Sequence, residues 1–224
     1  RREHRLDLRD RVPGLVGRRR GVVKGMTDVV ANMTMSLDGF IAHRDDGVAG
    51  LFDWYRGGDV AVEDFAGRRS SLTPVSAAYF RAELDRVGAF LVGRRLYDHT
   101  NGWEARPPTE APMVVVTHAA PADWPRDGVP ITFATEGIEA AVAEAQALAA
   151  RGGGGRVVSV AGAATARSCL DAGLLDEIVV NLVPIVLGDG IPFFAGACGP
   201  VALEEPEIVA APGVTHLRYR VARG

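Results

Sequence analysis

From Met26 onward, short apolar runs alternate with longer segments in which apolar residues recur at helical spacing. The apolar runs are rich in β-branched residues and predict strands at residues 29–37, 89–92, 113–117, 131–134, 156–160 and 178–186. Helices are predicted between them, at residues 74–87, 137–151 and 165–172, with a short helix opening at 93–97. The start at Thr73-Pro74 is typical of a helix N-terminus, because proline at the first helical position loses no useful N–H.

The end of the chain has a different pattern. Two strands are predicted at residues 201–210 and 214–221, and Pro212-Gly213 between them favours an antiparallel hairpin. Alternating strands and helices indicate a parallel sheet covered by helices, to which a terminal hairpin adds antiparallel strands. The pattern therefore predicts an α/β fold with a central mixed, mostly parallel sheet flanked by helices.

Residues 43–72 are predicted to be a long loop, because glycine, aspartate and arginine interrupt every apolar run. Such a connection inside a compact domain is usually functional or mobile. Trp54 and Tyr55 lie in it. Two alternatives are open for this pair: closing over a flat aromatic substrate, or anchoring the loop by packing.

Composition limits the possible functions. The chain has 224 residues and is 47% hydrophobic, which suits one domain, and no apolar run reaches the length of a membrane span. Residues 1–25 hold nine basic and three acidic residues, which leaves 16 basic and 25 acidic residues in 26–224. The acidic remainder argues against a nucleic-acid groove.

We interpret residues 1–25 as a disordered basic extension, or as sequence upstream of a natural start at Met26. A basic arm that binds nucleic acid is the functional alternative. Lys24 is the single lysine of the chain, so lysine Schiff-base chemistry and a P-loop lysine are both excluded from the remainder.

The cysteines and histidines do not predict a metal site. Cys169 and Cys198 are too few for a disulfide framework and lack metal-ligand spacing, and the five histidines are scattered. We therefore expect no metal and a reducing, cytoplasmic environment.

Two junctions between a strand and a helix are candidate phosphate sites. Residues 161–165 (Ala161, Gly162, Ala163, Ala164 and Thr165) follow the strand at 156–160 and open a helix, so backbone N–H groups and the helix dipole suit a pyrophosphate. Tight helix–sheet packing is the alternative. The segment is not a G-x-G-x-x-G fingerprint, and the glycines at 152–155 precede the strand, so a Rossmann site is excluded by position.

The second junction is Gly93-Arg94-Arg95. Arginine pairs bidentately with phosphate monoesters, so this site could select NADP over NAD. A solvated arginine pair is the alternative. His118, after the strand at 113–117, could also contact a phosphate or simply be solvated.

Asp38 is the candidate catalytic residue. It follows the first strand in the turn Ser36-Leu37-Asp38-Gly39, where a carboxylate could anchor a substrate or relay a proton. An aspartate before glycine is also a common turn residue, which is the alternative.

Six segments in this order resemble the dihydrofolate reductase-like family that includes the reductase domain of bacterial riboflavin biosynthesis: residues 36–42, 92–97, 115–117, 161–163, 172–177 and 184–194. The resemblance covers Met26 to about Val221. It implies a single dihydrofolate reductase-like domain over residues 26–224 with a three-layer fold. A homodimer that binds NADPH in an extended pose across the strand ends is also implied.

The resemblance also implies roles for individual residues. On the cofactor side, Gly93, Arg94 and Arg95 would meet the adenosine phosphate, Thr117 and His118 the adenosine end, and residues 161–165 the pyrophosphate, while Thr34 and Ile41 would flank the nicotinamide. The substrate side would comprise Ser36, Asp38, Trp54, Tyr55, Pro184, Leu187 and Gly188.

This chain departs from the family pattern in two places. Leu96 stands where many relatives have threonine, and Ala161 replaces a glycine. Both changes are expected to weaken the cofactor site without removing it, since backbone amides provide most of the contacts. The zinc-dependent deaminase half of bifunctional riboflavin enzymes is absent from the sequence.

The sequence thus predicts an NADPH-dependent oxidoreductase that transfers a hydride to a C=N or C=O group of a pterin-like, pyrimidine-like or pathway-specific substrate. The NADPH supplies the hydride, and the protein supplies orientation and a dry pocket. An alternative is a nucleotide-cofactor-binding protein of the same fold with a non-reductive or sensing role. A small-molecule partner is expected, with no membrane and no nucleic acid.

Overall fold

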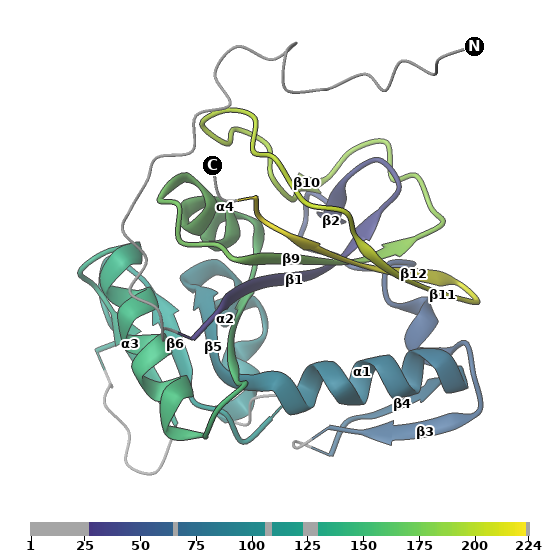
Figure 1. Cartoon of the computed structure of the whole chain (residues 1–224), viewed down its shortest axis with the longest axis horizontal. Coiled ribbons are helices and arrows are strands. Elements are labelled where there is room, and N and C mark those ends of the chain that lie inside the picture. The colour runs from purple at the N-terminus through teal and green to yellow at the C-terminus, as the bar shows by residue number, and fades with distance from the viewer. Residues whose placement is uncertain (1–26, 65–66, 106–108, 123–129, 223–224) are drawn as a thin grey trace, which may run out of the picture.

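The computed structural model describes residues 27–64, 67–105, 109–122 and 130–222. Its centre is an eight-stranded sheet with helices on both faces (Figure 1). The strands of this sheet are β1 (Val29–Ser36), β5 (Val87–Gly93), β6 (Met113–Val116), β7 (Ile131–Ala134), β8 (Val157–Ala161), β9 (Glu177–Val183), β11 (Glu207–Ala211) and β12 (Val214–Arg220).

The helices are α1 (Pro74–Arg86), α2 (Arg94–His99), α3 (Ile138–Arg151) and α4 (Ala163–Asp171), with shorter 3-10 turns η2 (Asp53–Arg56) and η3 (Asn101–Ala105). Two small antiparallel pairs accompany the main sheet, β10 (Ile191–Pro192) with β2 (Phe40–Ala42), and β3 (Val60–Glu63) with β4 (Arg69–Leu72). Among the described residues, no helix is long and apolar enough to cross a membrane.

The strand order of the main sheet is β11-β12-β9-β1-β8-β5-β6-β7. From β9 to β7 every neighbouring pair is parallel, whereas β12 is antiparallel to both β9 and β11. The mixed, mostly parallel sheet and its C-terminal hairpin are therefore confirmed. Because all the parallel strands run the same way, their carboxyl ends lie along one edge of the sheet.

The two faces of β1 explain how the sheet is layered. Residues two apart on a strand share a face, and on one face of β1 these are apolar: Ala31, Met33 and Met35 pack in the cluster that contains residues of α3 and α4. The other face, on the side of α1, begins with Val30, which packs with Tyr79, and continues with the polar residues Asn32, Thr34 and Ser36. The face of β1 toward α3 and α4 is thus apolar, whereas the face toward α1 is polar from Asn32 onward.

The start of α1 follows the prediction. The Oγ1 of Thr73 accepts a hydrogen bond from the N–H of Ser76 at 3.3 Å, and Pro74 occupies the first helical position. A side-chain cap of this kind satisfies one of the backbone N–H groups that the first turn leaves without a partner.

The structure corrects three expectations. Residues 43–72 are not a plain loop, since they contain η2 and the β3–β4 hairpin. The strand predicted at 178–186 ends at Val183, directly before Pro184, and the strand predicted from residue 201 begins at Glu207. The predicted N-terminal extension, residues 1–25, lies outside the described residues.

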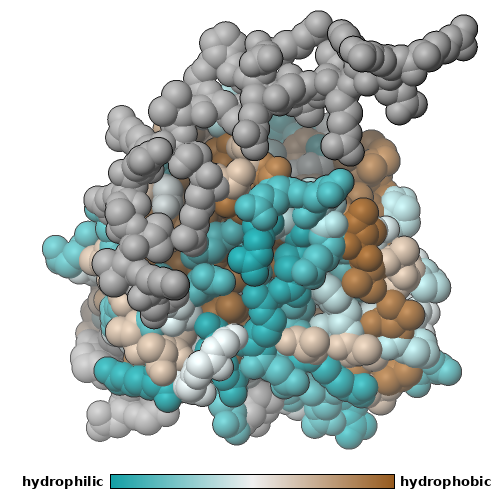
Figure 2. Space-filling view, in the orientation of Figure 1, coloured by the Kyte–Doolittle hydropathy of each residue, from teal (hydrophilic) through white to brown (hydrophobic). Residues whose placement is uncertain are grey.

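The surface carries apolar residues along the edge formed by β11. Ile208 on this edge strand is exposed, as are Val201 and Leu203 before it. Figure 2 shows apolar residues gathered at one side of this face, next to a hydrophilic band. The homodimer predicted from the sequence stays a prediction.

A buried glutamate joins three arginines at the start of β9. The side chain of Glu177 is 1% exposed, and its carboxylate lies 2.8 Å from Arg86 Nη2, 3.0 Å from Arg220 Nη2 and 3.5 Å from Arg218 Nη1. Arg218 also pairs with Glu83 of α1. This network connects the end of α1 to the two strands β9 and β12.

We predict that Glu177→Gln lowers the free energy of unfolding by about 2–3 kcal/mol, because removing one member of a buried ion pair leaves the opposite charges uncompensated. Urea unfolding measures the effect. The control is Glu205→Gln, which makes the same charge change at an exposed position. Equal stabilities for the two variants would contradict the structural role of the network.

Candidate functional site

The predicted cofactor residues meet at the carboxyl edge of the sheet. The last residues of β8, β5 and β6 are neighbours, because Ala161 pairs with Val92 and Gly93 pairs with Val116. The segments that follow these strands, residues 161–165, 93–95 and 117–118, therefore lie side by side. Ligands of open α/β sheets bind outside this edge.

The N-terminus of α4 has free donors. Gly162 is its N-cap residue, with φ +94°, and no side chain caps the helix. The N–H of Gly162 itself is directed to the Sδ of Met33 at 3.3 Å. An uncapped helix start with backbone N–H groups facing outward is suited to a phosphate group, so this part of the chain fits the pyrophosphate of a dinucleotide.

Gly93 lets the two junctions approach each other. A Cβ atom at this position would lie 2.7 Å from the Oγ1 of Thr165, and Thr165 is itself buried in the first turn of α4. A side chain at residue 93 would therefore require the Thr165 hydroxyl to move. The glycine accommodates the close approach of the two candidate phosphate sites.

The two arginines are held by weak contacts. Arg94 Nε lies 2.7 Å from Asp98, with Arg94 Nη1 3.3 Å from the carbonyl oxygen of Ala119, and Arg95 Nη2 lies 2.9 Å from Asp46. The side chain of Arg94 is 40% exposed and that of Arg95 is 67% exposed, and ion pairs that reach solvent in this way contribute little. Both guanidinium groups are therefore available to exchange these carboxylates for a phosphate.

Thr117 and His118 follow β6. The Oγ1 of Thr117 donates to the carbonyl oxygen of Ala119 at 3.0 Å and accepts from its N–H at 3.3 Å, which folds a tight turn. His118 is exposed in that turn. Leu96, in place of the expected threonine, packs with Val92 and its neighbours, so the departure turns a polar position into an apolar one.

The carboxylate of Asp38 is hydrogen-bonded to other residues of the protein. Its carboxylate accepts hydrogen bonds from the hydroxyl of Ser36 at 2.6 Å and from the N–H groups of Leu187 at 3.1 Å and Gly188 at 2.7 Å. The Ser36 hydroxyl, followed by these amides, holds the pKa of Asp38 below its ordinary value. The proton relay expected of Asp38 stays a prediction.

Ser36 has the same structural character. While its hydroxyl donates to Asp38, its oxygen accepts from the N–H of Phe40 at 3.0 Å. Both side chains thus fold the β1–β2 turn and fasten the loop that starts at Pro184. This geometry is what the turn-residue alternative expects of Asp38, and the substrate contacts expected of Ser36 and Asp38 stay predictions.

The residues expected around the nicotinamide lie on either side of that turn. Thr34 is buried on the α1 side of β1, and Ile41 packs into the cluster shared with α3 and α4. Pro184 and Gly188 are exposed, and Leu187 is half-buried. The N–H of Leu37 donates to the carbonyl oxygen of Ile185 at 2.8 Å, which keeps the two loops together.

Trp54 and Tyr55 face the interior. Trp54 is 4% exposed and packs with Leu51, Leu72 and Val214, and its ring stacks on that of Tyr55 at 4.2 Å. Burial raises the pKa of Tyr55. The packing alternative is therefore the better interpretation of this pair, and a direct contact with substrate stays untested.

A family model named RibD C-terminal domain matches residues 27–212. The chain belongs to this family. The Bacillus subtilis (strain 168) protein named Uncharacterized protein YwjB is 25% identical over 165 residues, covering 74% of this chain and 81% of that protein.

Three solved structures, each less than 25% identical in sequence to this chain, share its fold. A candidate riboflavin biosynthesis protein of Shewanella sp. PV-4 has a TM-score of 0.66 at 22% identity, covering 88% of this chain and 100% of that one. The Thermotoga maritima diaminohydroxyphosphoribosylaminopyrimidine deaminase/5-amino-6-(5-phosphoribosylamino)uracil reductase has a TM-score of 0.57 at 14% identity, covering 90% and 58%. Dihydrofolate reductase of Enterococcus faecalis, complexed with NADP(H), has a TM-score of 0.52 at 16% identity, covering 88% and 97%.

The comparisons confirm the dihydrofolate reductase-like fold and the riboflavin-reductase resemblance, and they indicate a reductase-type enzyme. The site of this RibD-type domain also contains polar residues that the sequence analysis missed. Asn32 and Ser159 lie on the face of β1 and β8 that carries Val30, and Asn181 of β9 pairs with Thr34 of β1. Each interrupts an apolar run, which was the available signal.

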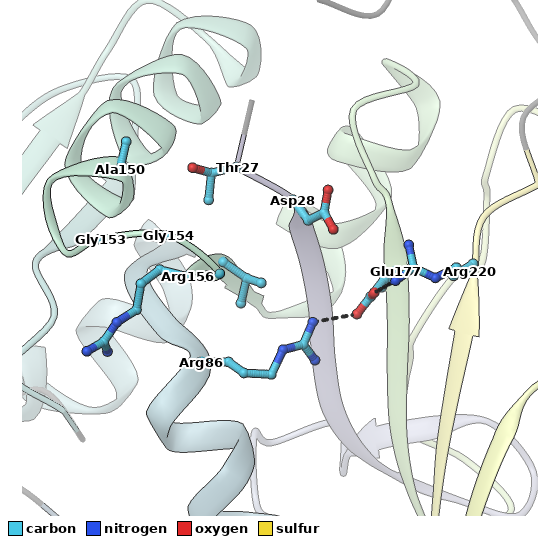
Figure 3. A pocket seen from close by; sticks show the side chains of 11 residues that line it. Thr27, Asp28, Arg86, Ala150, Gly153, Gly154, Arg156, Glu177 and Arg220 are labelled. Atoms are coloured by element: carbon cyan, nitrogen blue, oxygen red, sulfur yellow. Dashed lines mark hydrogen bonds and ion pairs between the residues drawn. The ribbon is translucent and has the colours of Figure 1, made fainter. Parts of the chain in front are cut away.

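A hollow of about 370 Å³ lies at the opposite edge of the sheet, at the amino ends of β1, β8 and β9. Asp28, Arg86, Gly154, Arg156 and Glu177 are among its lining residues. Figure 3 shows Arg86 paired with Glu177 and the Arg156 guanidinium directed away from that pair. Arg156 also has a partner in the protein, since its Nη1 donates to the carbonyl oxygen of Val87 at 3.0 Å. Because these arginines already bind protein groups, we look for the cofactor site at the carboxyl edge.

We predict that Asp38→Asn loosens the loop at Leu187 and Gly188, because an amide keeps one acceptor oxygen where the carboxylate has two. Amide hydrogen exchange should become several-fold faster at these two residues, whereas residues of β9 should exchange at the wild-type rate. Asp59→Asn, an exposed aspartate outside this turn, is the control. Unchanged exchange in Asp38→Asn would contradict the clamp.

Proposed function

We propose that this RibD-type domain is an NADPH-dependent reductase that transfers a hydride to a C=N or C=O group of a small pterin-like or pyrimidine-like heterocycle. One observation carries the proposal: the uncapped start of α4 lies directly beside the Gly93-Arg94-Arg95 junction at neighbouring strand ends. A neutral pyrophosphate cradle next to a pair of arginines suits a dinucleotide that carries an additional phosphate.

The comparisons support the same proposal. The Enterococcus faecalis enzyme of this fold is described in complex with NADP(H), and the Thermotoga maritima protein is named as a reductase of an aminouracil. We extend both features to this chain as part of the proposal. The alternative of a cofactor-binding protein with a sensing role keeps the same cofactor site and differs in having no turnover.

The cofactor would lie along the carboxyl edge. Residues 161–165 would hold the pyrophosphate through backbone N–H groups, Arg94 and Arg95 the adenosine phosphate, and Thr117 and His118 the adenosine end. Thr34 and Ile41 would flank the nicotinamide. When bound there, NADPH supplies the hydride.

The substrate would lie between β1 and the loop that Asp38 fastens. Pro184, Leu187 and Gly188 would form the wall of this pocket and exclude water. Asp38 would act by holding the wall in place, because its carboxylate already accepts three hydrogen bonds. We assign the proton that completes the reduction to solvent water. A homodimer in the cytoplasm remains the expected setting.

We predict that Arg94→Gln and Arg95→Gln each weaken NADPH binding about tenfold, which is the loss of roughly one charge-assisted hydrogen bond. The affinity for NADH should stay within twofold of wild type, because NADH lacks the phosphate that the arginines would contact. Quenching of tryptophan fluorescence measures both affinities.

The matched control is Arg151→Gln, an exposed arginine at the end of α3. No binding of either nucleotide by the wild-type protein would overturn the proposed function. Equal affinities for NADPH and NADH would overturn the role of the arginines. Binding of NADPH with no oxidation by any pterin or pyrimidine would favour the sensing alternative.

A further inference from the structure

A chain of uncharged polar side chains crosses the interior from α1 to β1. The Oγ of Ser76 lies 3.1 Å from Nε2 of His216, and Nδ1 of His216 lies 2.7 Å from Oδ1 of Asn181. The Nδ2 of Asn181 then donates to Oδ1 of Asn32 at 3.2 Å. Ser76, His216 and Asn181 are buried, and Asn32 is half-buried.

The chemistry of these groups gives the chain a direction. An amide oxygen can only accept, so Nδ1 of His216 must carry the proton, and Nε2 is left to accept from the hydroxyl of Ser76. Burial lowers the pKa of His216 to about 4, so the ring is neutral at pH 7. Every hydrogen bond of the chain therefore donates toward Asn32.

The packing around His216 holds this geometry. Its ring stacks on Tyr79 of α1 at 4.1 Å and meets the edge of Trp54 at 5.3 Å. Asn181 stands in the same row of the sheet as His216 on one side and Thr34 on the other. The polar chain is thus fixed by three strands and one helix.

Asn32 is the last member of this series of hydrogen-bonded side chains, and its amide NH₂ is free. Its Oδ1 accepts the hydrogen bond from Asn181 on β9, so the NH₂ is left to donate to another group. Over the residues that the structure describes, this nitrogen has no hydrogen-bond partner. Asn32 also directly follows Ala31, the last residue of β1 that pairs with β8. The NH₂ group of Asn32 therefore lies where β1 and β8 separate. Asn32 is two residues before Thr34 on β1, so the two side chains share a face of the strand.

We propose that Asn32 recognises the substrate by donating this NH₂ to a carbonyl oxygen, with Asn181, His216 and Ser76 as positioning residues. The inference rests on the proposed function, since it places the substrate beside a nicotinamide at Thr34. It narrows the substrate to heterocycles that present a neutral acceptor edge, such as a lactam. A cationic amidinium edge would find no carboxylate beside Asn32 on β1, because the polar side chains on this face of the strand are Asn32, Thr34 and Ser36. The carboxylate of Asp38, beyond the end of the strand, already accepts three hydrogen bonds from the protein.

Two probes test the specificity. 5,6-Diaminouracil presents carbonyl acceptors, and 2,4-diaminopyrimidine presents an amidinium edge when protonated. Calorimetry with and without NADPH should show that the wild-type protein binds the uracil at least tenfold more tightly. Asn32→Asp keeps the acceptor for Asn181 and replaces the free donor by a carboxylate oxygen, so it should reverse the preference. Asn101→Asp makes the same change at an exposed asparagine and should preserve it.

The outcomes are separable from those of the proposed function. Wild-type protein that binds neither probe, or that prefers 2,4-diaminopyrimidine, overturns the inference, as does an unchanged preference in Asn32→Asp. Failure to bind NADPH overturns the proposed function, while the preference between the probes is still read on the cofactor-free protein.

The positioning role has its own spectroscopic test. Long-range ¹H–¹⁵N NMR at pH 7 should show His216 protonated at Nδ1 and not at Nε2. Addition of 5,6-diaminouracil should shift the side-chain NH₂ resonances of Asn32 and leave those of Asn101 in place. A proton on Nε2 of His216, or unshifted NH₂ resonances of Asn32, would contradict the proposal that these hydrogen-bonded side chains orient the NH₂ of Asn32.

Discussion

The candidate site depends on the early end of one strand pairing. β1 pairs with β8 only from Val29 to Ala31, whereas it pairs with β9 up to Ser36. β8 meanwhile continues to Ala161 against β5. Beyond Ala31 the described parts of β1 and β8 are therefore no longer a ladder, and the N–H of Gly162 bonds to the sulfur of Met33 instead of to backbone. From Asn32 to Ser36, β1 therefore pairs with β9 on one side and, among the described residues, with no strand on the other.

Buried charged groups and buried uncharged polar groups lie at opposite edges of the sheet. The paired charges of Glu177 and its arginines lie at the amino edge of the sheet, where they join α1 to β9 and β12. At the carboxyl edge the interior groups are neutral amides, hydroxyls and one neutral imidazole. A buried uncharged chain avoids the desolvation cost of buried ions and still fixes the direction of a donor. The arginines of the carboxyl edge remain on the surface, where they can exchange partners.

The sequence was sufficient for features that depend on local pattern. The helix start at Thr73-Pro74, the parallel strands and the hairpin around Gly213 all follow from residues close together in the chain. It failed for β3 and β4, because the segments Val60–Glu63 and Arg69–Leu72 are short and partly polar, and they form a hairpin by pairing with each other and packing on Trp54.

The site was predicted in part for the same reason. Strand ends and glycines predicted the candidate phosphate sites, and the register of the sheet brings these segments together. Asp38 accepts hydrogen bonds from Leu187 and Gly188, which lie far along the chain. These bonds could therefore not be predicted from the Ser36–Gly39 turn alone. Asn32, Asn181 and His216 likewise become a chain only when β1, β9 and β12 are aligned.

The central claim is that the cofactor lies along the carboxyl edge, with its nicotinamide where β1 and β8 part. A crystal structure of the protein with NADPH tests this most directly. The account predicts the pyrophosphate against the N–H groups at the start of α4 and the nicotinamide next to Thr34. Density for NADPH in the hollow at the amino edge, beside Asp28 and Gly154, would contradict it.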